Sequence, residues 1–255
     1  MCLIVFAWQH SAGLRLALAG NRDEFHGRPT APLGWWGEPP LLAGRDLSAG
    51  GTWLGVDAGG RFGAITNFRG DTTPAAAPSR GTLIPRFLSS TQSPAAFLGA
   101  LAAERNRYAG FSLLLGDGHS LGYFCNRDPA PPRLLLPGVY GLSNATLDTP
   151  WPKLVQSRTR LTALLERGER DPERLFEAIA DRALAADAAL PDTGVGIELE
   201  RRLSAAFIVG ADYGTRSSTV LMLGSQGGGT VLERSYGADG RPLGSQRFTL
   251  AIPDG

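Results

Sequence analysis

The sequence predicts one α+β domain spanning residues 1–255, with four layers (αββα): two stacked, mainly antiparallel sheets covered by helices on both outer faces. Short apolar runs are joined in pairs through glycine-containing turns, a pattern typical of β-hairpins. Groups of these strands alternate along the chain with two helical regions, an order that favours layered packing. The 34 glycines among 255 residues are about twice the usual share, as expected where turns are frequent.

The first part of the chain is predicted to form two hairpins. Residues 2–8 and 14–19 are apolar runs joined by a Ser-Ala-Gly turn, and the second run leads into a polar loop at residues 21–24. Residues 27–51 contain four prolines and are expected to be irregular. Residues 52–57 and 61–66 then form the second hairpin.

Two helical regions are separated by further strands. Ser93 and Pro94 begin a helix that is expected to reach about residue 107, since serine caps helices and proline fits their first position; a shorter helix occupies residues 81–89. A hairpin at residues 111–125 and a strand near Val139 follow. Leu154, Leu161, Leu164 and Leu165 share one face of a later helix, and Asp171 caps the next one.

The end of the chain is predicted to add the remaining strands. They are expected at residues 205–210, 218–223, 230–236 and 248–252. The glycine-rich turn at 224–229 lacks the Gly-Lys-Ser/Thr ending of a phosphate-binding loop, so we predict no nucleotide site there. No internal repeat or linker divides the chain.

Composition excludes several classes of function. The formal net charge of +1 gives no electrostatic reason to expect nucleic acid or an anionic membrane as a partner. Two cysteines, without a Cys/His cluster, predict neither a disulfide framework nor a metal site. The apolar run at the N-terminus is too short for a membrane span or a signal sequence, so we expect a cytoplasmic protein.

Cys2 is the residue with the clearest chemical potential. Removal of Met1, which is usual before a small residue, would leave a thiol and a free α-amine on the same residue. The pKa of such an amine is about 8 and that of the thiol about 8.5, so the amine can serve as the base for its own nucleophile. If Met1 is retained, that base is absent. The competing interpretation is a cysteine buried at the start of a core strand, which is the commoner role for this residue type.

The residues Arg22 and Asp23 are expected to lie beside Cys2. If the first two strands pair as a hairpin, the end of the second lies next to the start of the first. A carboxylate there would hold or orient the α-amine, and an arginine would increase the thiolate fraction of the thiol. The alternative is a structural network of arginine and carboxylate that only secures the turn.

Three tryptophans indicate an apolar surface. Trp35 and Trp36 lie in the proline-rich stretch, where they either pack the loop onto the core or form a lid over a pocket. Trp53 is expected to form a wall of that pocket.

Several motifs, in this order, resemble those of the NRDE family, also called the transport and Golgi organisation 2 family. They extend over nearly the whole chain and are Met1-Cys2-Leu3-Ile4, Gly20-Asn21-Arg22-Asp23-Glu24-Phe25, Gly50-Gly51-Thr52-Trp53-Leu54-Gly55, Thr66-Asn67-Phe68-Arg69, Ser79-Arg80-Gly81, Gly141-Leu142-Ser143-Asn144, Trp151-Pro152-Lys153 and Tyr213-Gly214-Thr215-Arg216-Ser217. That family is in turn similar to cysteine-type N-terminal nucleophile hydrolases, which implies the αββα fold.

The resemblance also implies roles for individual residues. Cys2 is the expected nucleophile, Arg22 and Asp23 flank it, and Arg216 is the second cation near the thiol. Asn67 and Asn144 are expected to form an oxyanion hole. The remaining candidates are substrate-binding residues: Asn21, Glu24, Trp35, Trp36, Trp53, Arg69 and Arg80.

Two functions are therefore kept open. The first is hydrolysis of an amide or thioester bond of a small acyl substrate, with no cofactor required. The second is a non-catalytic protein on the same fold that binds and moves haem, acyl-coenzyme A or another lipid. The sequence carries no Cys-Pro or Cys-x-x-Cys-His haem signature, so haem would need a histidine or a thiol in another arrangement.

Overall fold

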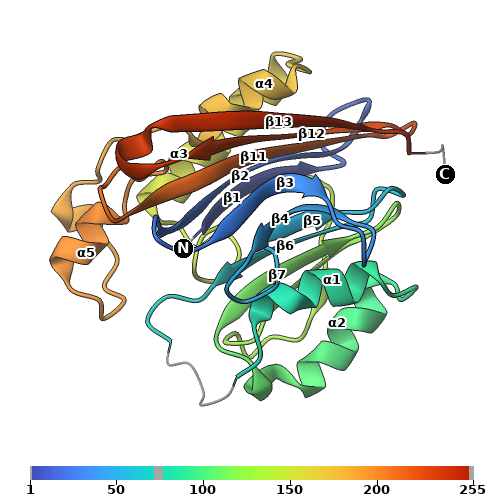
Figure 1. Cartoon of the computed structure of the whole chain (residues 1–255), viewed down its shortest axis with the longest axis horizontal. Helices are drawn as coiled ribbons and strands as arrows, with labels where there is room; N and C mark the ends of the chain where they lie inside the picture. Colours follow the sequence, from blue (N-terminus) through green and yellow to red (C-terminus); the bar gives the residue numbers. More distant parts are fainter. Residues whose placement is uncertain (1, 72–76, 253–255) are drawn as a thin grey trace.

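Two antiparallel β-sheets stack face to face between two layers of helices (Figure 1). The computed structural model describes residues 2–71 and 77–252. The predicted αββα order of layers is confirmed. Cys2 begins the first strand and so lies where that strand meets the space between the sheets.

The first sheet has six strands and contains the N-terminal hairpin. Its spatial order is β10 (Gly138–Leu142), β1 (Cys2–Trp8), β2 (Leu14–Phe25), β11 (Tyr213–Gly224), β12 (Gly229–Tyr236) and β13 (Pro242–Leu250). The central strands β1 and β2 are almost wholly buried, because they carry apolar side chains on both faces.

The second sheet has seven strands in sequence order. They are β3 (Thr30–Trp35), β4 (Leu42–Asp46), β5 (Leu54–Val56), β6 (Phe62–Asn67), β7 (Phe111–Gly116), β8 (Leu121–Cys125) and β9 (Arg133–Leu134). Strands that are neighbours along the chain pair with each other as a meander. Glycine turns between consecutive strands therefore correctly predicted the hairpins β5–β6 and β7–β8.

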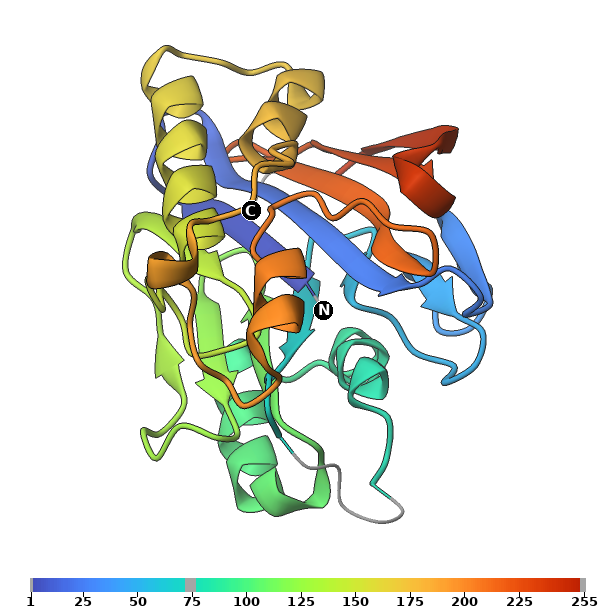
Figure 2. The same ribbon diagram turned by 90° about the vertical axis from the view of Figure 1, so that its left-hand side faces the viewer.

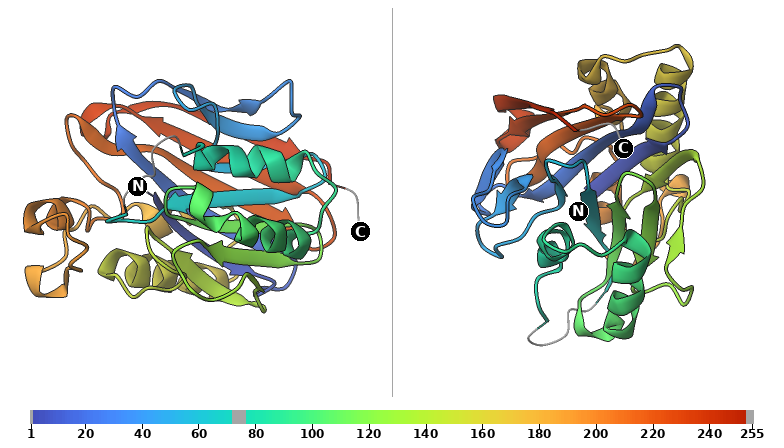
Figure 3. Two further views of the ribbon diagram at one scale, coloured as in Figure 1. Left: turned by 90° about the horizontal axis from the view of Figure 1, so that it is seen from below. Right: turned by 90° about the vertical axis from the view of Figure 1, so that its right-hand side faces the viewer.

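Helices cover the outer face of each sheet. The first sheet is covered by α3 (Pro152–Glu166) and the short α4 (Pro172–Leu175), and the second by α1 (Leu83–Leu88) and α2 (Pro94–Ala103). Figure 2 shows α3 beside β1 and β2, and Figure 3 shows α1 and α2 across the face of the second sheet. A fifth described helix, α5 (Ile197–Arg202), was not predicted; its residue Leu199 lines the same cavity as Cys2, the first residue of β1.

Three apolar clusters follow this layering. The largest lies between the two sheets and includes Phe6, Leu18, Phe62 and Leu114. The second joins the first sheet to α3, and the third joins the other sheet to α1 and α2. The alternation of β1 side chains between the first two clusters explains its unbroken apolar sequence.

The stretch at residues 27–51 is more regular than predicted. It contains β3 and β4, although Pro32 lies inside β3. The edge position of β3 resolves this, because a proline, which lacks an N–H group, is tolerated where no further strand needs that donor. The pairing of β3 with β4 also shifts register between Ala31 and Gly34, around the proline.

Two other local predictions were wrong. Residues 21–24 are not a loop, since β2 continues to Phe25 and pairs on both sides with β1 and β11. The predicted strand at residues 205–210 is instead an irregular segment. It is buried at residues 205–208, where Phe207 and Ile208 are 4% and 3% exposed, and Val209 is exposed. Its backbone bonds to Asp181 and Thr215 rather than to a complete ladder, so burial alone misled the prediction.

Candidate active site

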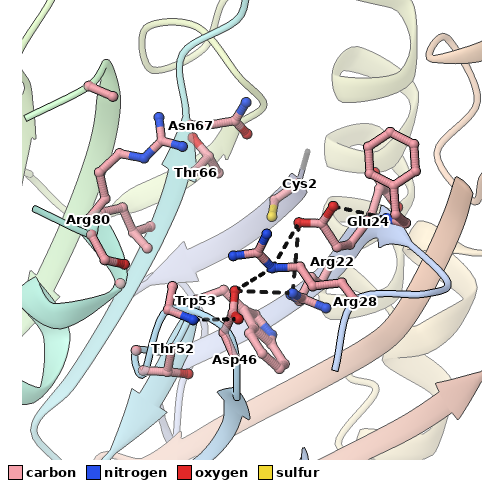
Figure 4. A pocket seen from close by; sticks show the side chains of 18 of the residues that line it. Cys2, Arg22, Glu24, Arg28, Asp46, Thr52, Trp53, Thr66, Asn67 and Arg80 are labelled. Atoms are coloured by element: carbon pink, nitrogen blue, oxygen red, sulfur yellow. Dashed lines mark hydrogen bonds and ion pairs between the residues drawn. The ribbon is translucent and has the colours of Figure 1, made fainter. Parts of the chain in front are cut away.

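Cys2 lies at the start of β1, directly opposite Arg22 on β2. Residues paired in this way project from the same face of a sheet. The Cys2 side chain is partly exposed and lines a cavity of about 720 Å³. Arg22, Asp23, Glu24, Trp53, Asn67 and Arg80 line the same cavity (Figure 4). The structure therefore brings most of the predicted site residues together.

Two arginines and two carboxylates form a charged cluster on one wall. The Arg28 Nε lies 2.8 Å from Asp46 Oδ2, and Arg22 Nη2 lies 3.7 Å from the same oxygen. Glu24 Oε2 lies 3.9 Å from Arg22 and 3.8 Å from Arg28. Because each carboxylate faces both cations, the Arg22 guanidinium is held in place beside Cys2. The predicted substrate-binding residue Glu24 is thus part of the support of Arg22.

Asp23 projects toward the helix layer that covers the first sheet. Its Oδ1 accepts a hydrogen bond of 2.7 Å from the Thr215 hydroxyl, and only 1% of the residue is exposed. Burial raises the pKa of the Asp23 carboxyl, and the Lys153 ammonium opposes that rise. β1 begins at Cys2, which pairs with Arg22, so Asp23 lies one residue beyond the end of this pairing. No residue of β1 lies opposite Asp23 in that pairing, and Asp23 lines the cavity.

The thiol of Cys2 is predominantly protonated at neutral pH. Burial raises its pKa, and this effect outweighs the nearby arginine, which acts in the opposite direction. A cysteine in this state needs a base before it can attack a carbonyl. The Cys2 carbonyl accepts a hydrogen bond of 3.1 Å from Ser143, which fixes the start of the strand.

Asn67 and Asn144 occupy different positions relative to the cavity. Asn67, the last residue of β6, lines it, whereas Asn144 lies behind and is 1% exposed. The Asn144 Nδ2 donates to Asn67 Oδ1 at 2.7 Å and to the Asn67 carbonyl at 3.2 Å. This pairing orients the Asn67 amide, so Asn67 is the oxyanion donor candidate and Asn144 its positioning residue.

Arg216, predicted as the second cation near the thiol, lies outside the cavity, whereas Arg80 lines it. Arg80 lines the cavity, across it from Arg22, and donates to the Gly110 carbonyl at 2.6 Å (Figure 4). Arg216 bonds to the carbonyls of Phe25 and Arg28 and lines a separate cavity. It lies at an irregularity of β11, where the pairing with β2 shifts register between Thr215 and Ser217.

Four of the predicted substrate-binding residues lie outside the cavity. Asn21 donates to two carbonyls, of Ile179 and Ala206, and accepts from Ser218, so it secures the irregular segment over the sheet. Trp35 is 47% exposed at the edge strand. The other two are structural: Trp36 donates to the Ala43 carbonyl and Arg69 forms a buried ion pair with Glu200.

Lys153 is a functional candidate to which the sequence reasoning gave no role. It lies in the first turn of α3, is 4% exposed and donates to the Leu203 carbonyl at 2.8 Å. Burial lowers its pKa to about 8, against an opposing effect of Asp23. It is the only lysine of the sequence, in which the other 24 of the 25 lysine and arginine residues are arginine. This choice of lysine at one position is the sequence feature that indicates a special role.

The single lysine makes its titration directly measurable. In protein labelled with ¹³C at the lysine side chain, we expect one Cε resonance that titrates with a midpoint of about 8. A midpoint near the usual 10.5 would show that the Lys153 ammonium is in contact with solvent, which would contradict its burial beside Asp23.

The same shift predicts a pH dependence of stability. Between about 8 and 10.5 the unfolded chain binds the lysine proton and the folded chain does not, so the free energy of unfolding rises with pH in that window. The rise amounts to about 3 kcal/mol, at about 1.4 kcal/mol per pH unit. We expect Lys153→Met to lack this increment in denaturant titrations at pH 7.5 and 10.

Comparison with solved structures assigns the fold to a class. The chain superposes on the structure of a Caenorhabditis elegans N-acylethanolamine-hydrolyzing acid amidase (NAAA) ortholog with a TM-score of 0.51. The match covers 86% of this chain and 92% of the other at 12% sequence identity. The protein therefore has the four-layer fold of N-terminal nucleophile hydrolases.

Sequence comparison then gives the family. The family model of Transport and Golgi organisation 2 matches residues 1–238. The Transport and Golgi organization protein 2 homolog of Bos taurus is 36% identical over 92% of this chain and 93% of its own length, and that of Homo sapiens is 34% identical over the same shares. The chain belongs to the Transport and Golgi organisation 2 family, which confirms the resemblance drawn from its motifs.

Proposed function

We propose that the protein is a hydrolase that cleaves an amide or thioester bond of a small acyl substrate, with Cys2 as the nucleophile. The observation that carries this proposal is the shared cavity of Cys2, Arg22, Asp23 and Asn67. A thiol can serve as nucleophile, an amide can donate to the oxyanion, and a cation and a carboxylate can adjust the charge around them during acyl transfer. The resting thiol requires a base, and the α-amine of Cys2 supplies it once Met1 is removed; Met1 lies outside the described residues.

The reaction would proceed in two steps. The α-amine takes the Sγ proton as sulfur bonds to the acyl carbon, and the carbonyl oxygen becomes an oxyanion that accepts from Asn67. Collapse breaks the bond to the leaving nitrogen or sulfur, which takes the proton from the ammonium. Water then attacks the Cys2 thioester in the same manner, releasing the acid and restoring the thiol. Asp23 favours the ammonium state through its negative charge.

Intact mass measurements test this proposal. The untagged protein, expressed from its own start codon, is expected to lack Met1 and to gain one acyl group when mixed with a butyryl thioester of N-acetylcysteamine. The adduct is expected on the Cys2 peptide, while Cys125, which is 2% exposed in β8, stays unmodified. An unmodified Cys2 together with no release of the free thiol from any acyl thioester would refute the hydrolase.

The size of the cavity favours one second function, the binding of a lipid, an acyl-coenzyme A or haem without catalysis. Its volume of about 720 Å³ lies within the range of small-molecule sites, roughly 300–1,000 Å³. None of the described lining residues is a histidine, so a haem iron would bind the Cys2 sulfur. Stoichiometric binding of palmitoyl-coenzyme A or haem to protein that retains Met1 would support this function, and saturation by neither would exclude it.

No helix in residues 2–71 and 77–252 has the length and apolar character needed to cross a membrane.

A further inference from the structure

Trp53 forms a common wall of three cavities. It precedes β5 and lines the cavity of about 720 Å³ that contains Cys2. It also lines a second cavity of about 240 Å³ and a small space of about 10 Å³ behind Cys2. Among the described lining residues, Trp53 alone is shared by all three cavities.

The indole ring is held in place by close contacts with Arg22 and Gly44. The Arg22 guanidinium carbon lies 4.4 Å from the ring centroid (Figure 4). On β4, a Cβ atom added to Gly44 would lie 2.4 Å from the Trp53 Cη2, so only glycine leaves room for the ring there. The backbone is fixed as well, because the Trp53 carbonyl accepts from the Ile65 N–H at 2.9 Å. Trp53 is thus a rigid partition.

The surroundings of Cys2 differ in polarity on its two sides. Toward the open cavity lie the charged groups of Arg22, Arg28, Asp46 and Arg80. Behind Cys2, between the sheets, the small space is lined mainly by the apolar side chains of Ile4, Leu54 and Ile65, with Trp53 closing it. The uncharged polar residues Asn21 and Thr219 also line it. An apolar acyl chain on the Cys2 sulfur is better stabilised on the second side, where no charged group loses water.

The second cavity lies on the other side of the indole. It is bounded by Thr30 and Pro32 of β3, by Leu243 of β13 and by the buried Glu233 of β12. Arg22 connects the two sides, since its Nη1 donates to the Thr30 hydroxyl at 3.3 Å while its guanidinium covers the indole. Removal of the indole would therefore join the space behind Cys2 to about 240 Å³ of further volume.

We propose that the acyl group of the substrate binds between the sheets behind Cys2, and that Trp53 limits this group to a short chain. This inference rests on the proposed hydrolase function and narrows its substrate class. The leaving group then occupies the larger, charged cavity. Trp53 is accordingly a specificity-determining residue, distinct from the groups that act on the reacting atoms.

A series of acyl thioesters of N-acetylcysteamine, from acetyl to dodecanoyl, tests the proposal. We measure the rate at which each acylates Cys2, by intact mass, in the wild-type protein and in Trp53→Ala. The wild type is expected to react fastest with the acetyl compound and more slowly with each longer one, because the space behind Cys2 is only about 10 Å³. In Trp53→Ala, the ratio of long-chain to acetyl rates is expected to rise about fourfold for each methylene that gains a buried position.

Two further variants make the result specific. Gly44→Ala displaces the indole without removing it and is expected to change the chain-length ratio in the same direction. Trp36→Ala removes an indole that also faces an arginine, with Arg45 4.5 Å from its centroid, but lines none of the three cavities; its ratio is expected to equal that of the wild type. The acetyl rate serves in every variant as the measure of an intact site.

The outcomes distinguish the role of Trp53 in chain length from the hydrolase function on which it rests. An unchanged ratio in Trp53→Ala, with normal acetylation of Cys2, overturns the role of Trp53 and leaves the hydrolase standing. Equal rates for acetyl and dodecanoyl thioesters in the wild type overturn it as well. Acylation of Cys2 by none of the compounds overturns the hydrolase, and the chain-length limit with it.

Discussion

Replacement of Cys2 by alanine is expected to reduce acyl-substrate turnover to the limit of detection. Sulfur supplies the bond that divides the reaction into two steps, and no second thiol is near, because Cys125 lies in the core of the other sheet. Loss of the nucleophile of a hydrolase costs roughly a millionfold in kcat. The measurement is release of free thiol from a butyryl thioester by equal amounts of wild-type and Cys2→Ala protein.

The matched control removes the other cysteine. Cys125→Ala deletes a buried sulfur that packs between the sheets, so it is expected to lower stability by about 1 kcal/mol while turnover stays at the wild-type rate. Turnover that persists in Cys2→Ala but disappears in Cys125→Ala would move the nucleophile to the second sheet and contradict the proposed mechanism.

The part of the site predicted from the sequence rests on local pairing. A hairpin of residues 2–8 with the following strand requires only a short turn, and its register places Cys2 opposite Arg22. Trp53 and Asn67 belong to the second hairpin, where Trp53 directly precedes β5 and Asn67 is the last residue of β6. Where chain neighbours pair as hairpins, turn chemistry and apolar alternation determine which side chains meet.

The part that was missed depends on contacts between distant segments. Asp46 reaches Arg22 only because β4 of the second sheet faces the first sheet, and periodicity carries no information on how two sheets stack. Lys153 lies near Asp23 because it belongs to α3, the helix that covers the face of β2 from which Asp23 projects. Arg22 projects from the other face. Arg216 was misplaced for the same reason, since its strand neighbours, and not its motif, determine where it points.

Replacement of Arg69 by methionine is expected to destabilise the fold strongly. Arg69 Nη1 lies 2.6 Å from Glu200 Oε2, and the two side chains are 4% and 3% exposed. The guanidinium carbon also lies 4.5 Å from the centroid of the Trp151 ring, at the start of α3. Removal of one partner leaves a buried carboxylate without its counter-charge, which costs about 3–5 kcal/mol. At about 2–4 °C per kcal/mol, the midpoint of thermal unfolding falls by roughly 10 °C.

Two comparisons distinguish this structural role from the substrate-binding role that the sequence predicted for Arg69. Arg201→Met, on the same helix as Glu200, removes a partly exposed arginine that bonds to Asp187 and Glu198, and it is expected to leave the unfolding midpoint unchanged. Arg69→Met combined with Glu200→Leu removes both buried charges and is expected to recover part of the lost stability, since the stranded carboxylate is the main cost. A wild-type midpoint in Arg69→Met, together with a raised KM, would instead return Arg69 to the substrate. The buried pair predicts the opposite result, because α5 and the end of β6 are joined through these two side chains.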